Sequence, residues 1–434
     1  MKQLTRLFIP ICLETLFYML SGMVDTLMLS AVGDYAVGAV GTANSYIGIF
    51  IIMFSIISSG MVSVMTQNIG AGRPGVAYQA RQLGLLFNAV AGVLMAVFLF
   101  SGAGAILRMV GIADALYEPA LIYLKIVGGG CILNAVIPIF SSYLRAFGYT
   151  KQPLYATIVG NMANFVMNAV FLFVLHKGVA GVAAATVISK ILNLCIVLYF
   201  SHKLISAKNS TERIANKTVL GQIVKVGLPS ACETALYNVA MMLVIRFLNQ
   251  MDAEGLNVTA RSYTATISNF SYCVGAALAQ ANAIMTGWHI GAGELEECDR
   301  GTKRAAFVGV CVAVCMETAI VLGSGFIMPL FTDNPEMTAL VRKLLAIDIV
   351  LEIGRVTNLV FGQALKTSGD AVFPAVIAAV FMFVFAVGGT WLFGISMGLM
   401  AVGAYIGLAS DECVRAVGMV WRWKTGKWRT KKLV

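Results

Sequence analysis

The residues that could do chemistry start with a carboxylate inside the first apolar segment, residues 7–31. One stripe of residues recurs there at spacings of four, four, three and four, which places all of them on one face of a helix: Pro10, Glu14, Tyr18, Ser21 and Asp25. A helix of this length rises about 37 Å, enough to cross a hydrocarbon core of about 30 Å. Asp25 would then lie inside a membrane, where a carboxylate either marks an ion or proton route or is held by a neighbouring helix.

A second polar stripe lies in the segment 153–175. Its members, at spacings of four, three and four, are Thr157, Asn161, Asn164 and Asn168, and Thr186, Lys190 and Asn193 repeat the pattern in the segment 178–201. Amides in a dry setting need partners, so these residues either bond between helices or bind a ligand. Together with Asp25 they offer the oxygen donors that a small hard cation takes, and protonation of Asp25 would serve equally well.

The second half of the chain carries Asp348, Glu352 and Arg355 at spacings of four and three, on one helix face. Glu352 and Arg355 can therefore form an ion pair. The alternatives are a second proton site or a counter-charge for a substrate. Glu233 belongs to the same set of candidates, although we expect both it and Glu14 to be structural, satisfied where two lobes meet.

Composition defines the elements that must position these residues. Of the 434 residues, 59% are hydrophobic and 12% are charged, about half the charged fraction of a soluble protein. Twelve apolar spans are predicted, at roughly 7–31, 40–68, 83–110, 119–146, 153–175, 178–201, 220–249, 257–288, 304–330, 338–366, 372–394 and 398–421. The chain is therefore predicted to be an all-α polytopic membrane protein.

Charge distribution predicts the orientation and excludes several function classes. Four basic residues fall in the predicted outer loops, Arg108, Lys177, Arg342 and Lys343, so both termini and the connection near Ser210 are expected in the cytoplasm. The basic tail, with Trp421, Trp423 and Trp428, is typical of a membrane-surface anchor rather than a nucleic-acid site. With three His and no phosphate loop or metal cluster, we expect no enzyme activity and no cofactor.

The two halves repeat. Pro10, Glu14, Thr15 and Tyr18 recur 219 residues later, and a Gly-Ala-Gly loop and the Leu144, Gly148, Pro153 pattern recur at 221. An even number of spans per half makes the repeats parallel, so two six-helix lobes related by a pseudo-twofold axis along the membrane normal are predicted. The expected domains are residues 1–202, a cytoplasmic linker 203–219, residues 220–421 and a basic tail 422–434. The position in the second half that is equivalent to Asp25 is Val244, so this carboxylate belongs to the first lobe alone.

Several of these patterns, in this order, resemble the multidrug and toxic compound extrusion (MATE) family. They are Pro10 to Asp25-Thr26, the Gly70-Ala71-Gly72 loop, Leu144 to Pro153, the Asn161–Asn164–Asn168 stripe and the small-residue run from Gly178 to Thr186. The resemblance covers nearly the whole chain. It implies an antiporter of the plasma membrane that exports drug-like, often cationic, organic compounds in exchange for Na⁺ or H⁺ by alternating access, and we expect it to act as a monomer.

The resemblance also implies a site. In archaeal and DinF-like members, the first-lobe ion site corresponds to Asp25, Asn164, Asn168 and Thr186, but those members carry Asp at the position of Asn168. One formal charge fewer should weaken a Na⁺ site at Asp25, and we favour H⁺. An acid that other members carry in the seventh span falls on Tyr237 here. The alternative function is a lipid-linked saccharide flippase of the same superfamily, which usually has fourteen spans and a cationic cleft.

Overall fold

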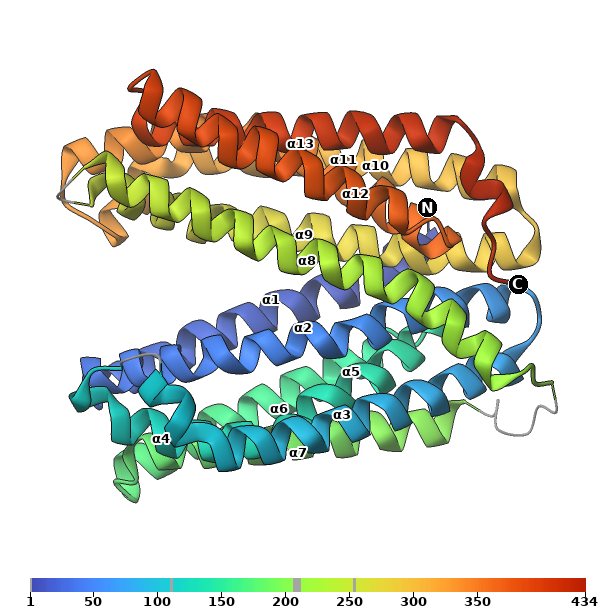
Figure 1. Ribbon diagram of the computed structural model, residues 1–434, viewed down its shortest axis with the longest axis horizontal. Helices are drawn as coiled ribbons and strands as arrows, with labels where there is room; N and C mark the ends of the chain where they lie inside the picture. The colour runs from blue at the N-terminus through green and yellow to red at the C-terminus, as the bar shows by residue number, and fades with distance from the viewer. Residues whose placement is uncertain (1, 110–111, 206–211, 253–254) are drawn as a thin grey trace. The chain divides into compact units, whose positions relative to one another are not determined.

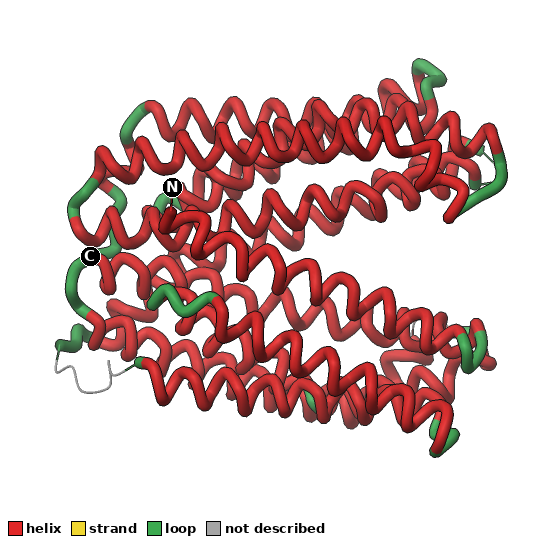
Figure 2. The backbone as a smooth tube through the Cα atoms, turned by 180° about the vertical axis from the view of Figure 1, so that it is seen from behind, coloured by secondary structure: helices red, strands yellow, loops and turns green. Residues whose placement is uncertain are grey.

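The computed structural model describes residues 2–109, 112–205, 212–252 and 255–434. Within these ranges the chain forms thirteen α-helices with short π and 3-10 segments and no strand (Figure 1). Short loops join consecutive helices (Figure 2). The loop at Ser210 lies outside the described residues.

The chain forms two compact units. The first lobe, Ile9–Gly227, contains most of α1 (Lys2–Ser30), the start of α8 (Asn216–Met251) and the elements between them. These are α2 (Asp34–Gly70), α3 (Pro74–Met109), α4 (Asp114–Gly129), α5 (Cys131–Ala146), α6 (Lys151–Ala169), η1 (Val170–Val174) and α7 (Gly178–Leu204).

The second lobe contains residues from Leu228 onward, joined by the N-terminal residues as far as Phe8. After the rest of α8 come α9 (Leu256–Ala292), α10 (Leu295–Ile327), η3 (Met328–Leu330), α11 (Pro335–Ser368), α12 (Val372–Phe381), η4 (Met382–Val387), η5 (Thr390–Ser396), α13 (Met400–Lys424) and η6 (Lys427–Thr430). Helix α11 packs against α9, α10 and α13. This central position makes α11 the scaffold for polar groups inside the lobe.

Eight helical segments of the described chain are long and apolar enough to cross a membrane. A ninth span is the pair α4 and α5, bent by 42° at Gly130 rather than at Pro138. Three consecutive glycines, residues 128–130, precede this break, and each weakens a helix by about 1 kcal/mol relative to alanine. The long helices α9, α11 and α13 are less apolar and carry many of the charged residues of the second lobe, whereas Glu233 lies on α8 and Glu317 on α10.

Large apolar side chains cover the outward faces of several of these helices. On α10, Leu322 is 76% exposed and Phe326 is 88% exposed. Such faces suit lipid, because the backbone of a helix is already hydrogen-bonded internally.

The first lobe contains one very close helix crossing, between α2 and α8. A Cβ atom added to Gly60 would lie 2.0 Å from the carbonyl oxygen of Ile223, and one added to Gly227 would lie 1.7 Å from that of Ile56. Only glycine permits this approach of two backbones.

The basic tail does not match its predicted role as a membrane anchor. Trp423 and Trp428 are buried and stacked, with ring centroids 4.2 Å apart, and Trp423 Nε1 donates to Asp299. Arg422 forms a bidentate ion pair with Asp370. These two rings are buried by packing against their own lobe rather than by contact with lipid. Trp421 remains exposed.

Candidate functional site

The first-lobe candidates meet between α1 and α6. Asn168 Nδ2 donates to Asp25 Oδ1 at 2.8 Å and to Asn164 Oδ1 at 3.1 Å. Both asparagines are buried, and Asp25 is half-buried. The spacing of four in α6 lets one amide bridge a carboxylate and the neighbouring amide. Asn168 Oδ1 is buried without a hydrogen-bond partner in the described chain, so the site retains an unused oxygen donor.

A lysine lies near this cluster. Lys190 of α7 donates from Nζ to Asn134 Oδ1 at 2.8 Å and interacts electrostatically with Asp25, without a direct ion pair among the described residues. The thiol of Cys131 is a further electrostatic neighbour of Lys190. Sequence analysis placed Lys190 on a polar stripe but not in the site, because the stripe alone does not show that it faces Asp25.

Thr186 reaches the site through a tyrosine. Its hydroxyl donates to the Val182 carbonyl of its own helix at 2.9 Å. The hydroxyl of Tyr123 interacts with Thr186 and Asn44, and Tyr123 lies in the field of Asp25. The four candidate residues of the first lobe therefore belong to one polar cluster, with Tyr123 and Lys190 as additional members.

A π-helical segment follows this cluster directly. Segment η1 begins at Val170, two residues after Asn168. The second lobe has a π segment at the repeat-equivalent place, η5. Single π turns interrupt helices mainly near functional sites, because they shift the register of the side chains that follow.

Glu14 and Glu233 pair inside their own lobes. Arg145 Nη2 lies 2.6 Å from Glu14 Oε1, and Lys366 Nζ lies 2.7 Å from Glu233 Oε2. These pairs agree with the expectation that both acids are structural, and they account for both acids without a contact between the lobes. Each acid is held by a base from the fourth span of the same repeat.

The second lobe encloses a cavity of about 460 Å³ between α8, α9, α11, η4 and α13. Its charged lining residues are Glu233, Arg261, Asp348, Arg355, Lys366, Asp411, Glu412 and Arg415. Tyr237, Tyr272 and Tyr405 add aromatic surface. The size of this cavity is within the range of sites that bind small organic molecules, but its lining carries more charge than such sites usually have.

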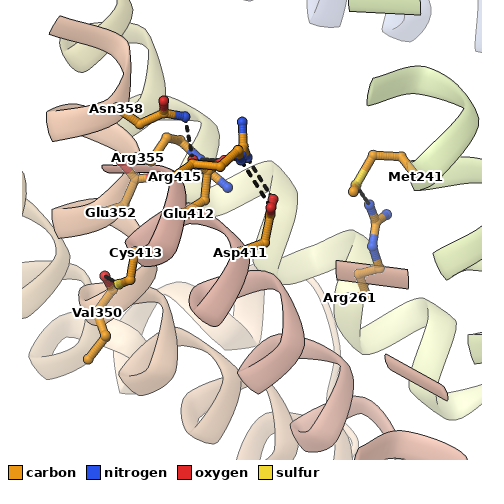
Figure 3. A network of polar contacts seen from close by, with 10 residues as sticks. All are labelled: Met241, Arg261, Val350, Glu352, Arg355, Asn358, Asp411, Glu412, Cys413 and Arg415. Carbon is orange, nitrogen blue, oxygen red and sulfur yellow. Dashed lines mark hydrogen bonds and ion pairs between the residues drawn. The ribbon is translucent and has the colours of Figure 1, made fainter. Parts of the chain in front are cut away.

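A network of ion pairs crosses this cavity (Figure 3). Arg415 contacts both oxygens of Asp411, at 2.7 and 3.0 Å, and lies 2.8 Å from Glu412. Arg355 contacts Glu352 directly and lies 3.8 Å from Glu412. Arg261 stands apart in Figure 3, facing the sulfur of Met241, and has no ion pair among the described residues.

Three carboxylates gather beside this network. One oxygen each of Glu317, Asp348 and Glu352 lie within 4.8 Å of one another, and all three residues are buried. Neither oxygen of Glu317 has a hydrogen-bond partner in the described chain. Arg355 is the base that contacts this group, through Glu352. Three buried acids with one base need further positive charge, from protons or a cation.

Four charged residues of this region were not among the candidates predicted from the sequence: Glu317, Asp411, Glu412 and Arg415. Glu317 is an isolated acid in a long apolar helix, and intramembrane acids are functional candidates by default, so it could have been found. The spacing of Asp411 and Glu412 to Arg415, four and three, likewise predicts pairing on one helix face.

The MatE family model matches the chain twice, at residues 10–170 and 229–392. The chain belongs to the MatE family. Two successive matches to one model also confirm the internal repeat. Both matched ranges contain site residues, including Asp25 and Asn168 in the first and Glu317 and Glu352 in the second.

Similar proteins agree with this assignment. The chain is 32% identical to the uncharacterized transporter YisQ of Bacillus subtilis. The alignment covers 97% of this chain and 94% of YisQ. It is 20% identical to the probable multidrug resistance protein NorM of Thermotoga maritima, covering 100% of this chain and 94% of that protein. A crystal structure of a variant of the Vibrio cholerae MATE transporter VcmN superposes with a TM-score of 0.88 at 17% identity, covering 99% of this chain and 98% of the other.

The comparison confirms the predicted fold class, a MATE-type bundle of twelve spans in two lobes. The twelve spans correspond to α1, α2, α3, the bent pair α4–α5, α6 with η1, α7, α8, α9, α10, α11, α12 with η4 and η5, and α13. Thr186 and Lys190 lie between the two regions that match the MatE model, and Asp411 to Arg415 lie beyond the second.

Proposed function

We propose that this protein is a secondary active antiporter that exports drug-like organic compounds, often cationic ones, in exchange for protons. The observation that carries the proposal is the hydrogen bond from Asn168 to Asp25 inside membrane-spanning helices. A half-buried carboxylate that accepts a hydrogen bond from a neutral amide can bind and release one proton, which is the step that an antiporter couples to its substrate. Similarity to the probable multidrug resistance protein NorM of Thermotoga maritima supports drug export.

The side chains of the first-lobe cluster favour protons over Na⁺. Asp25 is the carboxylate of the first-lobe cluster, and Asn164, Asn168 and Thr186 are neutral. A Na⁺ ion held by one carboxylate and neutral oxygens gains less electrostatic stabilisation than one held by two carboxylates. A proton needs one carboxylate only.

The test is uptake of a fluorescent organic cation into inverted membrane vesicles, whose lumen corresponds to the outside of the cell, with a Na⁺ gradient and a pH gradient imposed separately. Transport driven by the pH gradient, at equal Na⁺ on both sides, is the expected result. Transport driven by Na⁺ at equal pH would overturn the choice of proton, and no transport with either gradient would overturn antiport of this probe class.

In the second lobe, we propose that Glu317, Asp348 and Glu352 hold at least one proton when the lobe is folded. Their oxygens lie within 4.8 Å of one another, and full ionisation would leave two charges without a base. Glu233 is excluded from this group, because Lys366 neutralises it.

A lipid-linked saccharide flippase is the second candidate function, favoured by the four basic residues that line the second-lobe cavity. Three of them, Arg355, Lys366 and Arg415, are paired with carboxylates, which leaves Arg261 to receive an anionic headgroup. Flipping of a fluorescent lipid diphosphate in reconstituted liposomes, with no response to the organic cation, would establish this alternative.

The proposal places the protein in the plasma membrane as a monomer, with both termini and the connection between the lobes in the cytoplasm. Small organic molecules and the lipid bilayer are its partners, and nucleic acid is not. The distribution of Lys and Arg supports this orientation.

A further inference from the structure

We propose that Arg81 of the first lobe binds the phosphate group of an anionic phospholipid at the edge of the membrane. Arg81 is a buried positive charge that no acid of the described chain neutralises. The inference concerns a lipid partner, and it depends neither on the substrate nor on the coupling ion.

The guanidinium group of Arg81 lacks hydrogen-bond acceptors. Arg81 lies on α3 and is 7% exposed. Its guanidinium group forms no ion pair and no hydrogen bond within the described ranges, and its Nε is buried without a partner. Arg145 of the same lobe shows the usual arrangement, because Glu14 lies 2.6 Å from its Nη2. A guanidinium group stays charged and carries five N–H donors, so Arg81 needs oxygen acceptors that the described chain does not supply.

Three aromatic rings surround this charge. The Cζ atom of Arg81 lies 4.5 to 5.4 Å from the ring centroids of Tyr78, Phe140 and Tyr143. The rings attract the cation, but they are not oxygen acceptors for its N–H groups. A phosphate group meets the remaining need, because two of its oxygens can accept hydrogen bonds from one guanidinium group at the same time.

The fold does not require a charge at this position. Helices α3 and α10 begin 221 residues apart, which is the offset of the internal repeat, so Thr302 is the equivalent of Arg81 in the second lobe. Thr302 is also buried, and its hydroxyl lies 3.4 Å from Asn282 Nδ2 and from Thr286 Oγ1. Neutral side chains therefore fill the same place in the second lobe, and helix packing alone does not explain Arg81.

The position of Arg81 along α3 corresponds to the level of the lipid headgroups. It lies seven residues after Pro74, where α3 begins, and two residues before the apolar span predicted from residue 83. Further along the same helix, Leu86 is 60% exposed and Phe87 is 48% exposed, as expected of a helix that borders lipid. Basic and aromatic side chains are typical of this level, where they contact headgroups.

An anionic lipid suits Arg81 better than a zwitterionic one. The phosphate of phosphatidylglycerol has no cation of its own, so Arg81 would be its counter-ion. In phosphatidylcholine the choline group already neutralises the phosphate. Inorganic phosphate offers the same oxygens without acyl chains, and it therefore distinguishes a free anion from a lipid.

The experiment measures the unfolding temperature of the purified protein in nanodiscs of phosphatidylcholine that contain increasing fractions of phosphatidylglycerol. Wild type should be stabilised saturably. Arg81→Met, which keeps an unbranched side chain, should need at least about ten-fold more phosphatidylglycerol for the same shift, because charged hydrogen bonds are lost. Arg73→Gln is the matched control, since it removes an exposed charge just before α3, and it should respond as wild type does.

Two further measurements separate binding from folding. In non-ionic detergent without added lipid, Arg81→Met should be at least as stable as wild type, because a buried charge without an acceptor has been removed. If the methionine variant folds poorly, Arg81→Thr introduces the residue that the second lobe carries at the equivalent position, and it should show the same loss of response.

Several results would overturn the proposal. Equal responses of wild type and Arg81→Met to phosphatidylglycerol would exclude Arg81, and an equal loss of response in Arg73→Gln would assign the effect to general surface charge. No response of wild type would show that water satisfies the guanidinium group. Stabilisation by inorganic phosphate in detergent that equals the stabilisation by phosphatidylglycerol would replace the lipid with a free anion.

Discussion

Arg145 of α5 lies 2.6 Å from Glu14 of α1, and the structure repeats this relationship in the other lobe with Lys366 and Glu233. In each lobe the pair ties the first span to the fourth. Thr157 adds a hydrogen bond to Glu14 at 3.4 Å. The two lobes therefore share a supporting ion pair, whereas the chemistry differs: an amide and carboxylate cluster in the first and a carboxylate-rich network in the second.

Asp25→Asn should reduce proton-driven uptake to the background of empty vesicles, because the variant cannot release a proton from this position. Insertion and folding should be unchanged. The measurement is vesicle uptake at matched protein levels, with Asp114→Asn, an exposed acid at the start of α4, as the control. Wild-type rates in Asp25→Asn would remove Asp25 from the mechanism.

Lys177→Cys should react with a membrane-impermeant maleimide added outside the cell, and Glu212→Cys should not. Both positions are exposed, and the positive-inside rule puts them on opposite sides. The nine native cysteines must be replaced first. Labelling of Glu212→Cys in intact cells would reverse the proposed orientation.

Glu317→Gln should stabilise the protein at pH 8 by at least about 1 kcal/mol, because a neutral amide removes a buried charge that has no base of its own. The stability of wild type should fall more steeply with rising pH than that of the variant, because Glu317 adds an ionisable buried group without a base of its own. Thermal unfolding at a series of pH values measures the effect. Glu297→Gln, an exposed acid of the same helix, should change neither value, and equal slopes for wild type and Glu317→Gln would contradict the prediction.

Gly227→Ala should destabilise the fold by about 1 to 3 kcal/mol, because the added methyl group would meet the carbonyl oxygen of Ile56 at 1.7 Å. Gly221→Ala provides the control on the same helix, since nothing lies within 4 Å of its new Cβ. Thermal unfolding of both variants tests the crossing of α2 and α8. Equal unfolding temperatures would show that the helices separate at little cost.

Asp252 should make a pH-dependent contribution to stability. Desolvation opposes its ionisation, but hydrogen bonds from Asn257 and Leu256 outweigh it and hold the pKa of Asp252 below its usual value. Because the folded-state pKa is lowered, this stabilisation is present above pH of about 4 and is lost as the pH falls through the folded value. Asp252→Ala should lose about 1 kcal/mol at pH 7 as the cap of α9 is removed. Asp252→Asn should lose the pH dependence, and an unchanged acid unfolding profile in Asp252→Asn would contradict this account.

Apolar runs and helix-breaking residues predicted every membrane span, but not the full length of each helix. Helix α3 begins at Pro74 and α10 at Leu295, where predictions from hydropathy began at 83 and 304. Their first turns are polar and still helical, because the polar side chains of a helix that extends beyond the membrane can form hydrogen bonds with water. The break at Gly130 was not predicted, because hydropathy shows residues 119–146 as one continuous apolar span.

The candidate site was predictable where one helix face carried the information. The spacings within α1 and α6 placed Asp25, Asn164 and Asn168 correctly relative to their own helices. The approach of Lys190 to Asp25, and of Glu317 to Asp348, depends on how α7 and α10 pack against other helices. Periodicity within one segment does not contain that information.

The docked tail has a consequence for biogenesis. Trp428 stacks on Trp423, and Leu433 is buried and lies near Gly369 at the end of α11. A ribosome releases these residues only after the whole of α13 has been synthesised. The contact between the tail and the end of α11 therefore forms late in biogenesis, when every span of the second lobe has already been made.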